Sequence, residues 1–203
     1  MGTVVVDLSM SLDGFIAGAG DGPSSPLGRG GEALFRWMAA GPEENRVESR
    51  ISPPDASKAV VEEWTTGGGA IISGRRTFDI AGGWRDGHPI DVPIFVVTHE
   101  VPTSGQWSPR VSFVTEGLDR ALELAQEAAE DRTVAIAGAS LAQQLLRAGK
   151  LDEIQVSLVP VLLGGGVRLL EHFGDEPVEL EQIRVVESDG VTHLRYRVVR
   201  VGP

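Results

Sequence analysis

The chain has 203 residues, of which 41% are hydrophobic and 23% are charged, so it can fill a hydrophobic core and is not a disordered chain. Its formal net charge of −11 argues against nucleic acid or an anionic membrane surface as the main partner. The sequence has no cysteine and its four histidines lack the close spacing of a metal motif, which excludes disulfides and predicts no metal site.

The first residues and the hydropathy pattern bear on location. Met-Gly-Thr-Val-Val-Val-Asp carries no basic region or signal-type apolar run, and no stretch approaches the roughly 20 apolar residues of a membrane span. We therefore expect a soluble cytoplasmic protein. With no internal repeat and no convincing linker, we expect one domain over residues 1–203, in which the polar residues 40–54 form an exposed insertion.

Runs of β-branched residues, helical spacing and turn signals predict the elements of the chain. In chain order they are a strand at 4–8, loops at 11–17 and 21–31, helices at 32–38 and 56–64, a strand at 70–73, a helix at 77–81, strands at 93–98 and 111–115, a helix at 118–130, a strand at 133–137, a helix at 140–148, a strand at 154–159, a flexible turn at 164–166, and strands at 178–187 and 191–201. We expect Asp55 to cap the second helix. Alternating strands and helices favour an α/β fold with a mostly parallel sheet covered by helices on both faces, and the last two strands form a C-terminal antiparallel hairpin.

The junction between the strand 133–137 and the helix that follows it consists of three small residues, Gly138, Ala139 and Ser140. Small side chains allow a ligand to approach the backbone, and the first N–H groups of a helix, with the positive end of its dipole, favour an anion. The junction is therefore a candidate phosphate site. A tight strand-to-helix turn also requires small residues, so a purely structural role is the alternative.

A second strand-to-helix junction carries Arg75, Arg76 and Thr77 after Gly74. A guanidinium group offers a fixed set of donors that suits phosphate oxygens, and the threonine adds a hydroxyl at the start of the helix. Two such junctions suggest one ligand with phosphates at both ends, such as a dinucleotide, and an arginine pair would suit the 2′-phosphate of NADPH. The alternative for an isolated Arg-Arg pair is two solvated side chains on a loop.

Four segments give the chain a resemblance to a known family. They are Ser11-Leu-Asp-Gly-Phe-Ile-Ala, Ser73-Gly-Arg-Arg-Thr-Phe, Ala137-Gly-Ala-Ser-Leu and Asp152-Glu-Ile-Gln-Val-Ser-Leu-Val-Pro-Val-Leu-Leu-Gly-Gly-Gly. In this order and spacing they resemble the dihydrofolate reductase superfamily, and more closely its branch related to the C-terminal reductase domain of the bifunctional riboflavin-biosynthesis deaminase-reductase. The resemblance covers nearly the whole chain outside residues 40–54. It implies a three-layer α/β fold around a central mixed sheet, with NADPH bound across the ends of the strands.

The resemblance also implies cofactor roles for individual residues. The positions that match the motif for the adenosine 2′-phosphate and part of the pyrophosphate are Gly74, Arg75, Arg76 and Thr77. The positions that match the pyrophosphate turn are Gly138, Ala139, Ser140 and Leu141. Thr98 and His99 match positions that flank the adenine ribose, and Ile16 and Ala17 match the loop edge over the nicotinamide. Family members usually have Gly-Gly where this chain has Ala137-Gly138, and in dihydrofolate reductases that peptide bond is cis, so its geometry is left open here.

The substrate side carries fewer signals. A heterocyclic hydride acceptor also needs a proton. Dihydrofolate reductases place a carboxylate in the helix after the first loop, where Glu32 is the only carboxylate of this chain, and Asp13 beside the nicotinamide loop is the other candidate acid. The structural alternative for Glu32 is a carboxylate favoured by the dipole in the first turn of a helix. The structural alternative for Asp13 is a turn aspartate that bonds its own backbone. Ser157 matches a hydroxyl position of the substrate pocket and Phe35 could stack on a planar ring, although a satisfied buried serine and a core aromatic are the structural alternatives.

These features lead to two hypotheses of different classes. The first is an NADPH-dependent reductase that transfers a hydride to a small heterocycle, such as a dihydrofolate-like pterin or a ribosylaminopyrimidinone phosphate. The second is a nucleotide-binding protein of the same fold without turnover. Close relatives in the family that the chain resembles pair as dimers, and a long β-branched edge such as the terminal hairpin is usually covered, so we expect a homodimer.

Overall fold

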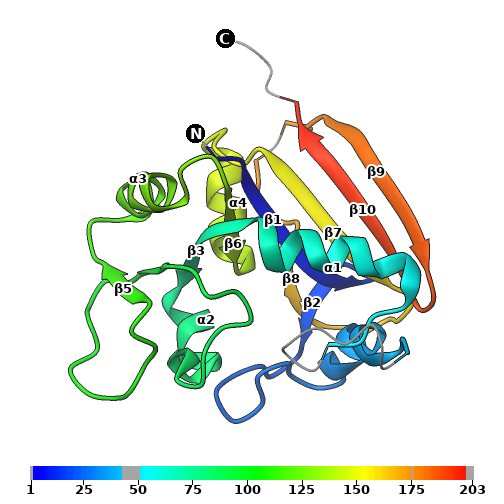
Figure 1. The fold of residues 1–203 in the computed structure, drawn as a ribbon, viewed down its shortest axis with the longest axis horizontal. Coiled ribbons are helices and arrows are strands. Elements are labelled where there is room, and N and C mark those ends of the chain that lie inside the picture. The colour runs from blue at the N-terminus through cyan, green and yellow to red at the C-terminus, as the bar shows by residue number, and fades with distance from the viewer. Residues whose placement is uncertain (1, 43–50, 175, 200–203) are drawn as a thin grey trace.

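The computed structural model describes residues 2–42, 51–174 and 176–199, whose strands form an eight-stranded sheet and a separate two-stranded sheet (Figure 1). The strands are β1 (Val4–Ser11), β2 (Phe15–Gly18), β3 (Gly68–Gly74), β4 (Ile94–Val97), β5 (Val111–Val114), β6 (Thr133–Ala137), β7 (Glu153–Val159), β8 (Gly166–Arg168), β9 (Leu180–Ser188) and β10 (Val191–Val198). The helices are η1 (Gly31–Ala39), α1 (Asp55–Gly67), α2 (Arg75–Ile80), η3 (Gly82–Trp84), α3 (Leu118–Ala129) and α4 (Ala139–Arg147). In space, the large sheet has the order β5-β4-β3-β6-β1-β7-β10-β9.

The large sheet is mostly parallel. All neighbours from β5 to β7 run parallel, whereas β10 is antiparallel to both β7 and β9. The predicted mostly parallel sheet with a C-terminal antiparallel hairpin is therefore confirmed. Because the strands from β5 to β7 point the same way, the carboxyl ends of β3, β6 and β1 meet at one edge of the sheet.

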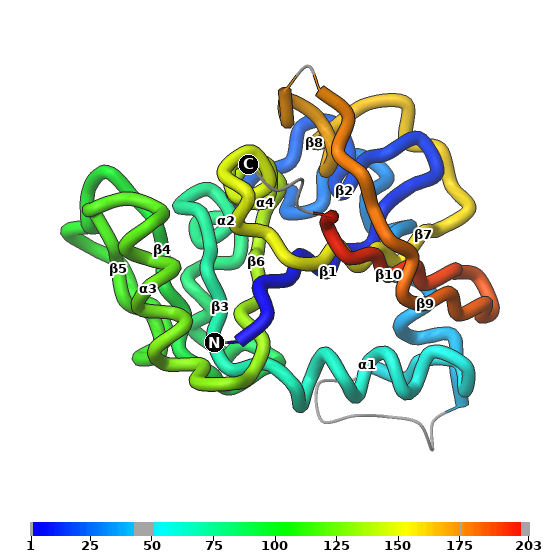
Figure 2. The backbone as a smooth tube through the Cα atoms, turned by 90° about the horizontal axis from the view of Figure 1, so that it is seen from above, coloured from blue at the N-terminus to red at the C-terminus, as the bar shows by residue number. Residues whose placement is uncertain are grey.

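Helices cover both faces of this sheet, as the continuous apolar sequence of its central strands requires. On one face, α3 and α4 pack into a core that includes Ala125 and Leu145. On the other face, α1 contributes Val61 and Trp64 to two further clusters. Figure 2 shows α1 and α4 on opposite sides of the sheet, so the chain has the three layers that the resemblance implies.

Two short strands replace segments predicted to be irregular. The sequence predicts a loop at 11–17 and a flexible turn at 164–166, but β2 and β8 form here and pair antiparallel with each other. Strands of four and three residues are too short to show an alternating pattern. Their pairing joins segments about 150 residues apart, and no local pattern reveals such a contact.

The starts of two helices also differ from prediction. The cap of α1 is Pro54 rather than Asp55, which is the first helical residue; the proline ring fixes its φ, at −55°, and the Asp55 carboxylate suits the positive end of the helix dipole. The helix α2 begins at Arg75 rather than Thr77, because β3 continues through Gly74 directly into it. Both arginines of the second junction therefore lie in the first turn of a helix.

Most of the expected insertion at 40–54 falls outside the described residues. Its carboxyl end is not exposed: Ser52 and Pro53 are buried, and the Ser52 N–H donates to the Met38 carbonyl oxygen at 2.7 Å. This end of the segment therefore packs on η1, a contact that polar composition alone does not indicate. Among the helices that the structure describes, none is long and apolar enough to span a membrane.

Candidate functional site

The two predicted phosphate junctions lie side by side at the carboxyl ends of β3 and β6. Ser73 and Ala137 are the last residue pair of these neighbouring strands. Gly138 follows with a φ of 119°, a conformation that favours glycine. A Cβ atom on Gly138 would lie 2.9 Å from the Thr77 hydroxyl oxygen, closer than real Cβ contacts, so the glycine allows the two junctions to touch.

A cleft of about 310 Å³ opens at this edge of the sheet. It brings together most of the residues predicted to bind the cofactor, namely Ile16, Ala17, Gly74, Arg76, Thr77, Gly138, Ala139, Ser140 and Leu141. Gly138 is the N-cap of α4 and has no side chain to bond the first N–H groups of that helix, which are the groups that suit a phosphate. The cleft therefore has the chemistry to hold a phosphate of a dinucleotide.

The two arginines of the second junction point in different directions. Arg76 lines the cleft, and its Nη2 donates to a carboxylate oxygen of Asp21 at 2.7 Å and to the Asp21 carbonyl oxygen at 2.9 Å. Arg75 lies outside the lining, where its Nε donates to Asp79 Oδ1 at 2.9 Å and its Nη1 donates to the Glu100 carbonyl oxygen at 3.1 Å. Successive residues of an α-helix point about 100° apart, which separates the two side chains.

Thr98 and His99 also lie outside the lining of the cleft. Thr98 is buried, with its hydroxyl donating to the Glu100 carbonyl oxygen at 2.9 Å, and His99 is exposed. Because β3 separates β4 from β6, the end of β4 is one strand further from Gly138. The cleft lining thus does not include Arg75, Thr98 or His99, and of the predicted cation pair only Arg76 faces the cleft.

The cleft adjoins a second pocket near the point where the pairing of β1 with β6 ends. The pairing of β1 with β6 stops at Val6 and Ile136, whereas β1 continues to Ser11 along β7. Beyond this point β1 is no longer paired with β6, and Leu8 lines both the cleft and the second pocket. Ligands in the two spaces would therefore meet across Leu8.

The second pocket has a volume of about 260 Å³ and lies between β1, β7, η1 and α1. Its walls include the apolar side chains of Phe35, Trp37, Met38, Val60 and Trp64. It brings together Phe35 and Ser157, the two residues predicted to contact the substrate. Asp7 and Ser9, which are two positions apart on β1, complete its polar lining.

Asp7 is an acidic residue that the sequence analysis missed. It keeps some accessible surface because it lines the pocket, but it is otherwise enclosed by protein, and this burial raises its pKa from 3.8 to about 7. A hydrogen bond from Gln155 Nε2 to Asp7 Oδ2, 2.7 Å long, opposes that rise. An aspartate inside a run of β-branched residues predicted to be a buried strand is the sequence signal that could have revealed it.

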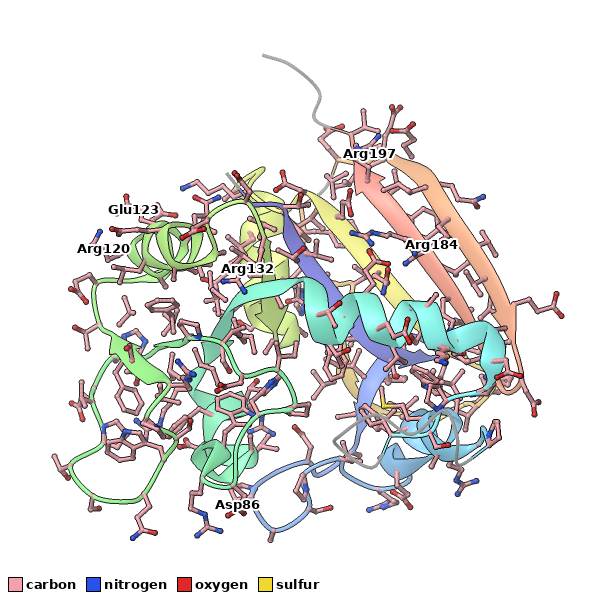
Figure 3. The ribbon with its side chains drawn as sticks, viewed as in Figure 1. Asp86, Arg120, Glu123, Arg132, Arg184 and Arg197 are labelled. Atoms are coloured by element: carbon pink, nitrogen blue, oxygen red, sulfur yellow. The ribbon has the colours of Figure 1, made fainter. Side chains whose placement is uncertain are left out.

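A network of hydrogen bonds and ion pairs fixes the position of Asp7 through Gln155. The buried Gln155 accepts a hydrogen bond from Arg184 Nη2 at 3.0 Å, and Arg184, labelled in Figure 3, forms an ion pair of 2.8 Å with Glu63 on α1. Arg195 bonds the same Glu63 and also Glu153, the latter at 2.7 Å. Both arginines are therefore neutralised by carboxylates other than Asp7.

Ser157 belongs to a second hydrogen-bonded group. The ring of the buried His193 lies between two hydroxyls, with Nδ1 2.9 Å from Ser157 Oγ and Nε2 2.8 Å from Ser57 Oγ. Ser57 also bonds the Ser188 hydroxyl at 2.8 Å, so these side chains hold one another in place. In either tautomer of the His193 ring, the Ser157 oxygen keeps at least one lone pair that can accept a hydrogen bond at the pocket.

The two carboxylates predicted as catalytic acids lie outside this pocket. Asp13 accepts hydrogen bonds from the Ser11 hydroxyl at 2.6 Å and from the N–H groups of Leu163 and Gly164 at 3.1 and 2.7 Å, and these bonds, with that of Ser11 the largest cause, lower its pKa to about 2. Glu32 is exposed in the first turn of η1. Asp13 and Glu32 therefore do not line the second pocket, and among the described residues that line it Asp7 is the acid.

Two further expectations concern the backbone and metals. All peptide bonds of the described residues are trans, including the one between Ala137 and Gly138. The same residues contain no group of three or more histidine, aspartate or glutamate side chains that could hold a metal ion.

The fold and the site agree with a family relationship. Residues 2–194 match the RibD C-terminal domain family, and the chain belongs to this family. A similar solved structure is a protein of Shewanella sp. PV-4 described as a putative riboflavin biosynthesis protein, with 24% identity and a TM-score of 0.67 over 98% of this chain and all of that one. No curated protein matches the chain.

Two longer proteins share the same fold. Acinetobacter baumannii RibD is 18% identical with a TM-score of 0.62, and the alignment covers 98% of this chain and 59% of that protein. A diaminohydroxyphosphoribosylaminopyrimidine deaminase/5-amino-6-(5-phosphoribosylamino)uracil reductase of Thermotoga maritima is 14% identical with a TM-score of 0.60, over 98% of this chain and 57% of that protein. The chain therefore spans a little over half the length of these two proteins.

Proposed function

We propose that the chain is an NADPH-dependent reductase of a small heterocyclic compound. The observation that carries the proposal is the contact between the Thr77 and Gly138 junctions inside one cleft, which adjoins a second, acid-containing pocket at Leu8. Membership of the RibD C-terminal domain family and the reductase name of the Thermotoga maritima protein support the same reaction class. The substrate is a pterin of the dihydrofolate type or an aminopyrimidine of the type in that name.

The residues of the cleft fit the cofactor as follows. The first N–H groups of α4, at Ala139 and Ser140, would hold the pyrophosphate, and Arg76 with Thr77 would hold the 2′-phosphate. Ile16 and Ala17, at the side of the cleft formed by β2, would cover the nicotinamide. When bound, NADPH supplies the hydride of the reaction.

The chain itself supplies the proton in this proposal. With a pKa of about 7, the Asp7 carboxyl is partly protonated at neutral pH and can give its proton to a substrate nitrogen in the pocket. The carboxylate then regains a proton from water. Gln155 keeps the carboxylate oriented during this exchange, because its amide is itself fixed by Arg184.

Binding of NADPH tests the cofactor part of the proposal. We expect the native protein to change the fluorescence of the reduced nicotinamide, and Gly138→Ala to weaken NADPH about tenfold or more because its Cβ atom would collide with Thr77. The matched control is Gly117→Ala, because Gly117 is also a helix N-cap, at the start of α3, with a positive φ of 101° and no atom within 4 Å of a Cβ. Equal losses in the two variants would contradict the cleft assignment.

Charge variants test the form of the cofactor. Arg76→Ala should weaken NADPH much more than NADH, because only NADPH carries the 2′-phosphate, whereas Arg75→Ala should affect the two alike. Turnover is then measured as the loss of reduced nicotinamide with dihydrofolate or a diaminopyrimidine. Binding without consumption of NADPH with either compound would favour a nucleotide-binding protein without turnover.

A further inference from the structure

We propose that the pocket beneath α1 takes a flat nitrogen heterocycle without a phosphate group, recognised through the Asp7 carboxyl and the Ser157 hydroxyl. This inference rests on the proposed reductase function and narrows its substrate class. It bears on the aminopyrimidine left open above, because a phosphoribosylaminouracil carries a phosphate group whose charge the pocket would have to accept.

The charge of the pocket argues against a phosphate. Among its lining residues in the described part of the chain, Asp7 is the one charged side chain, and none is lysine, arginine or histidine. Phosphate recognition relies on cations or on several converging N–H donors. A phosphate placed here would instead meet an acidic group, which disfavours the doubly charged ligand.

Two arginines of the described residues that lie close to Asp7 are already bonded to carboxylates. Arg195 lines a small neighbouring cavity of about 40 Å³ that Asp7 also borders, but its guanidinium bonds Glu153 at 2.7 Å and Glu63. Arg184 is bonded to Glu63 and Gln155. A phosphate could recruit Arg195 only by breaking its pair with Glu153, whose side chains are 18% and 13% exposed, whereas the side chain of Arg76 in the cleft is 66% exposed beside Asp21.

The walls of the pocket suit a flat ring. Phe35, Trp37 and Trp64 line it, and Trp37 is fixed by a hydrogen bond from its Nε1 to Ser9 Oγ at 3.1 Å and by an edge contact with His193 at 4.9 Å between ring centres. The volume of about 260 Å³ lies below the roughly 300–1,000 Å³ of typical ligand pockets. A single flat ring is therefore of the right size to fill the pocket.

The polar groups of the pocket favour a ligand with N–H donors. Ser157 keeps a free lone pair in either tautomer of His193, and Asp7 offers an oxygen beside the one that accepts from Gln155. The two side chains come from the neighbouring strands β1 and β7, two positions apart in register, since Ser9 pairs with Ser157. A ring with adjacent amino and ring-nitrogen groups can bond both strands.

A matched pair of ligands tests the absence of a phosphate site. The probes are 5-amino-6-(5-phosphoribosylamino)uracil and the same compound without its phosphate, titrated into the full chain by calorimetry. We expect the compound without phosphate to bind about tenfold or more tightly than the phosphorylated one. Equal or tighter binding of the phosphorylated compound would overturn the inference, and so would the absence of binding by both.

Variants test the recognition of the ring. The probe is 2,4-diaminopyrimidine, followed by calorimetry and by quenching of tryptophan fluorescence. Asp7→Asn and, independently, Ser157→Ala should each weaken it several-fold to tenfold, whereas the exposed Glu123→Gln on α3 should leave it unchanged. Unchanged affinity in both pocket variants would overturn the inference. Ring binding that depends on Asp7 in a protein that fails to bind NADPH would support this inference and refute the proposed reductase.

Discussion

The buried carboxyl of Asp7 should make the protein less stable at high pH, and Asp7→Asn should remove that effect. The asparagine keeps the shape of the side chain, and its carbonyl oxygen can still accept the hydrogen bond from Gln155. In the unfolded chain the Asp7 carboxyl loses its proton near its ordinary pKa of 3.8, whereas in the folded chain it holds the proton up to about pH 7. Between these values the folded state binds more protons, so the free energy of unfolding of the native chain falls as pH rises, and it levels off above pH 7.

The size of the effect follows from the shift in pKa. Each pKa unit corresponds to about 1.4 kcal/mol, so a shift of about 3 units costs the native chain up to about 4 kcal/mol above neutral pH. Between about pH 5 and about pH 8, the free energy of unfolding of Asp7→Asn should rise relative to that of the native chain by about 2 to 3 kcal/mol.

Urea unfolding followed by tryptophan fluorescence, at about pH 5 and about pH 8, measures this difference. Glu123→Gln is the control, because its carboxylate is exposed on the surface of α3 and pairs with Arg120 in a contact that Figure 3 locates. The control should track the native chain at both pH values. If the difference between Asp7→Asn and the native chain does not widen with pH, Asp7 is not the buried, proton-holding group described above.

Three further predictions concern other parts of the chain. Asp13→Asn should lower the thermal midpoint of unfolding at neutral pH, because it weakens the hydrogen bond that the Asp13 carboxylate accepts from Gly164. The difference in midpoint from the native chain should disappear as pH falls from about 4 toward 2, because the native carboxylate then takes up a proton and loses its charge. Burial first, and then the charge of Arg184, lower the pKa of His193 to about 4, so its ring signals in NMR should stay constant from about pH 5 to pH 8; a titration in that range would contradict its packing. We also propose that the protein forms a homodimer through the edge strand β9, where Val185 is 48% exposed. Light scattering should give a molecular mass of twice the 21.6 kDa of one chain, and Val185→Glu should reduce the measured mass to that of one chain. A native protein with the mass of one chain would refute the pairing.

Much of the sheet can be predicted from the sequence because its signals are local. The parallel strands of the large sheet are short apolar runs, and the helices between them show apolar residues at helical spacing or a cap residue at their start. That Gly138 and Thr77 lie at the same edge also follows, since the strand-to-helix junctions of a parallel sheet all lie at the carboxyl ends of its strands. That they touch does not follow, because β4 and β5 come between β3 and β6 in the chain and only the strand order of the structure makes β3 and β6 neighbours. Pairing between distant segments has no local signal, which is why β2 and β8 are absent from the prediction.

The substrate side could not be predicted for a different reason. A carboxylate is identified as an acid by its surroundings, and those of Asp7 include Glu63 on α1, Gln155 on β7 and Arg184 on β9, which lie more than 50 residues away in the chain. Residue type alone favours Glu32 and Asp13, which sit beside recognisable motifs. Likewise, the sequence suggests that Arg75 and Arg76 act as one cationic group. Only the structure shows that both lie on a helix, which points their side chains in different directions.

The early end of the pairing between β1 and β6 divides the large sheet into two four-stranded halves, joined along a seam of three residue pairs. The cleft and the second pocket lie on either side of this seam, so molecules that fill both would contact both halves at once. Binding of both molecules would therefore stabilise the two halves against separation. The amide hydrogens of Val6 and Ile136 would then exchange with solvent more slowly in the ligand-bound protein than in the free protein.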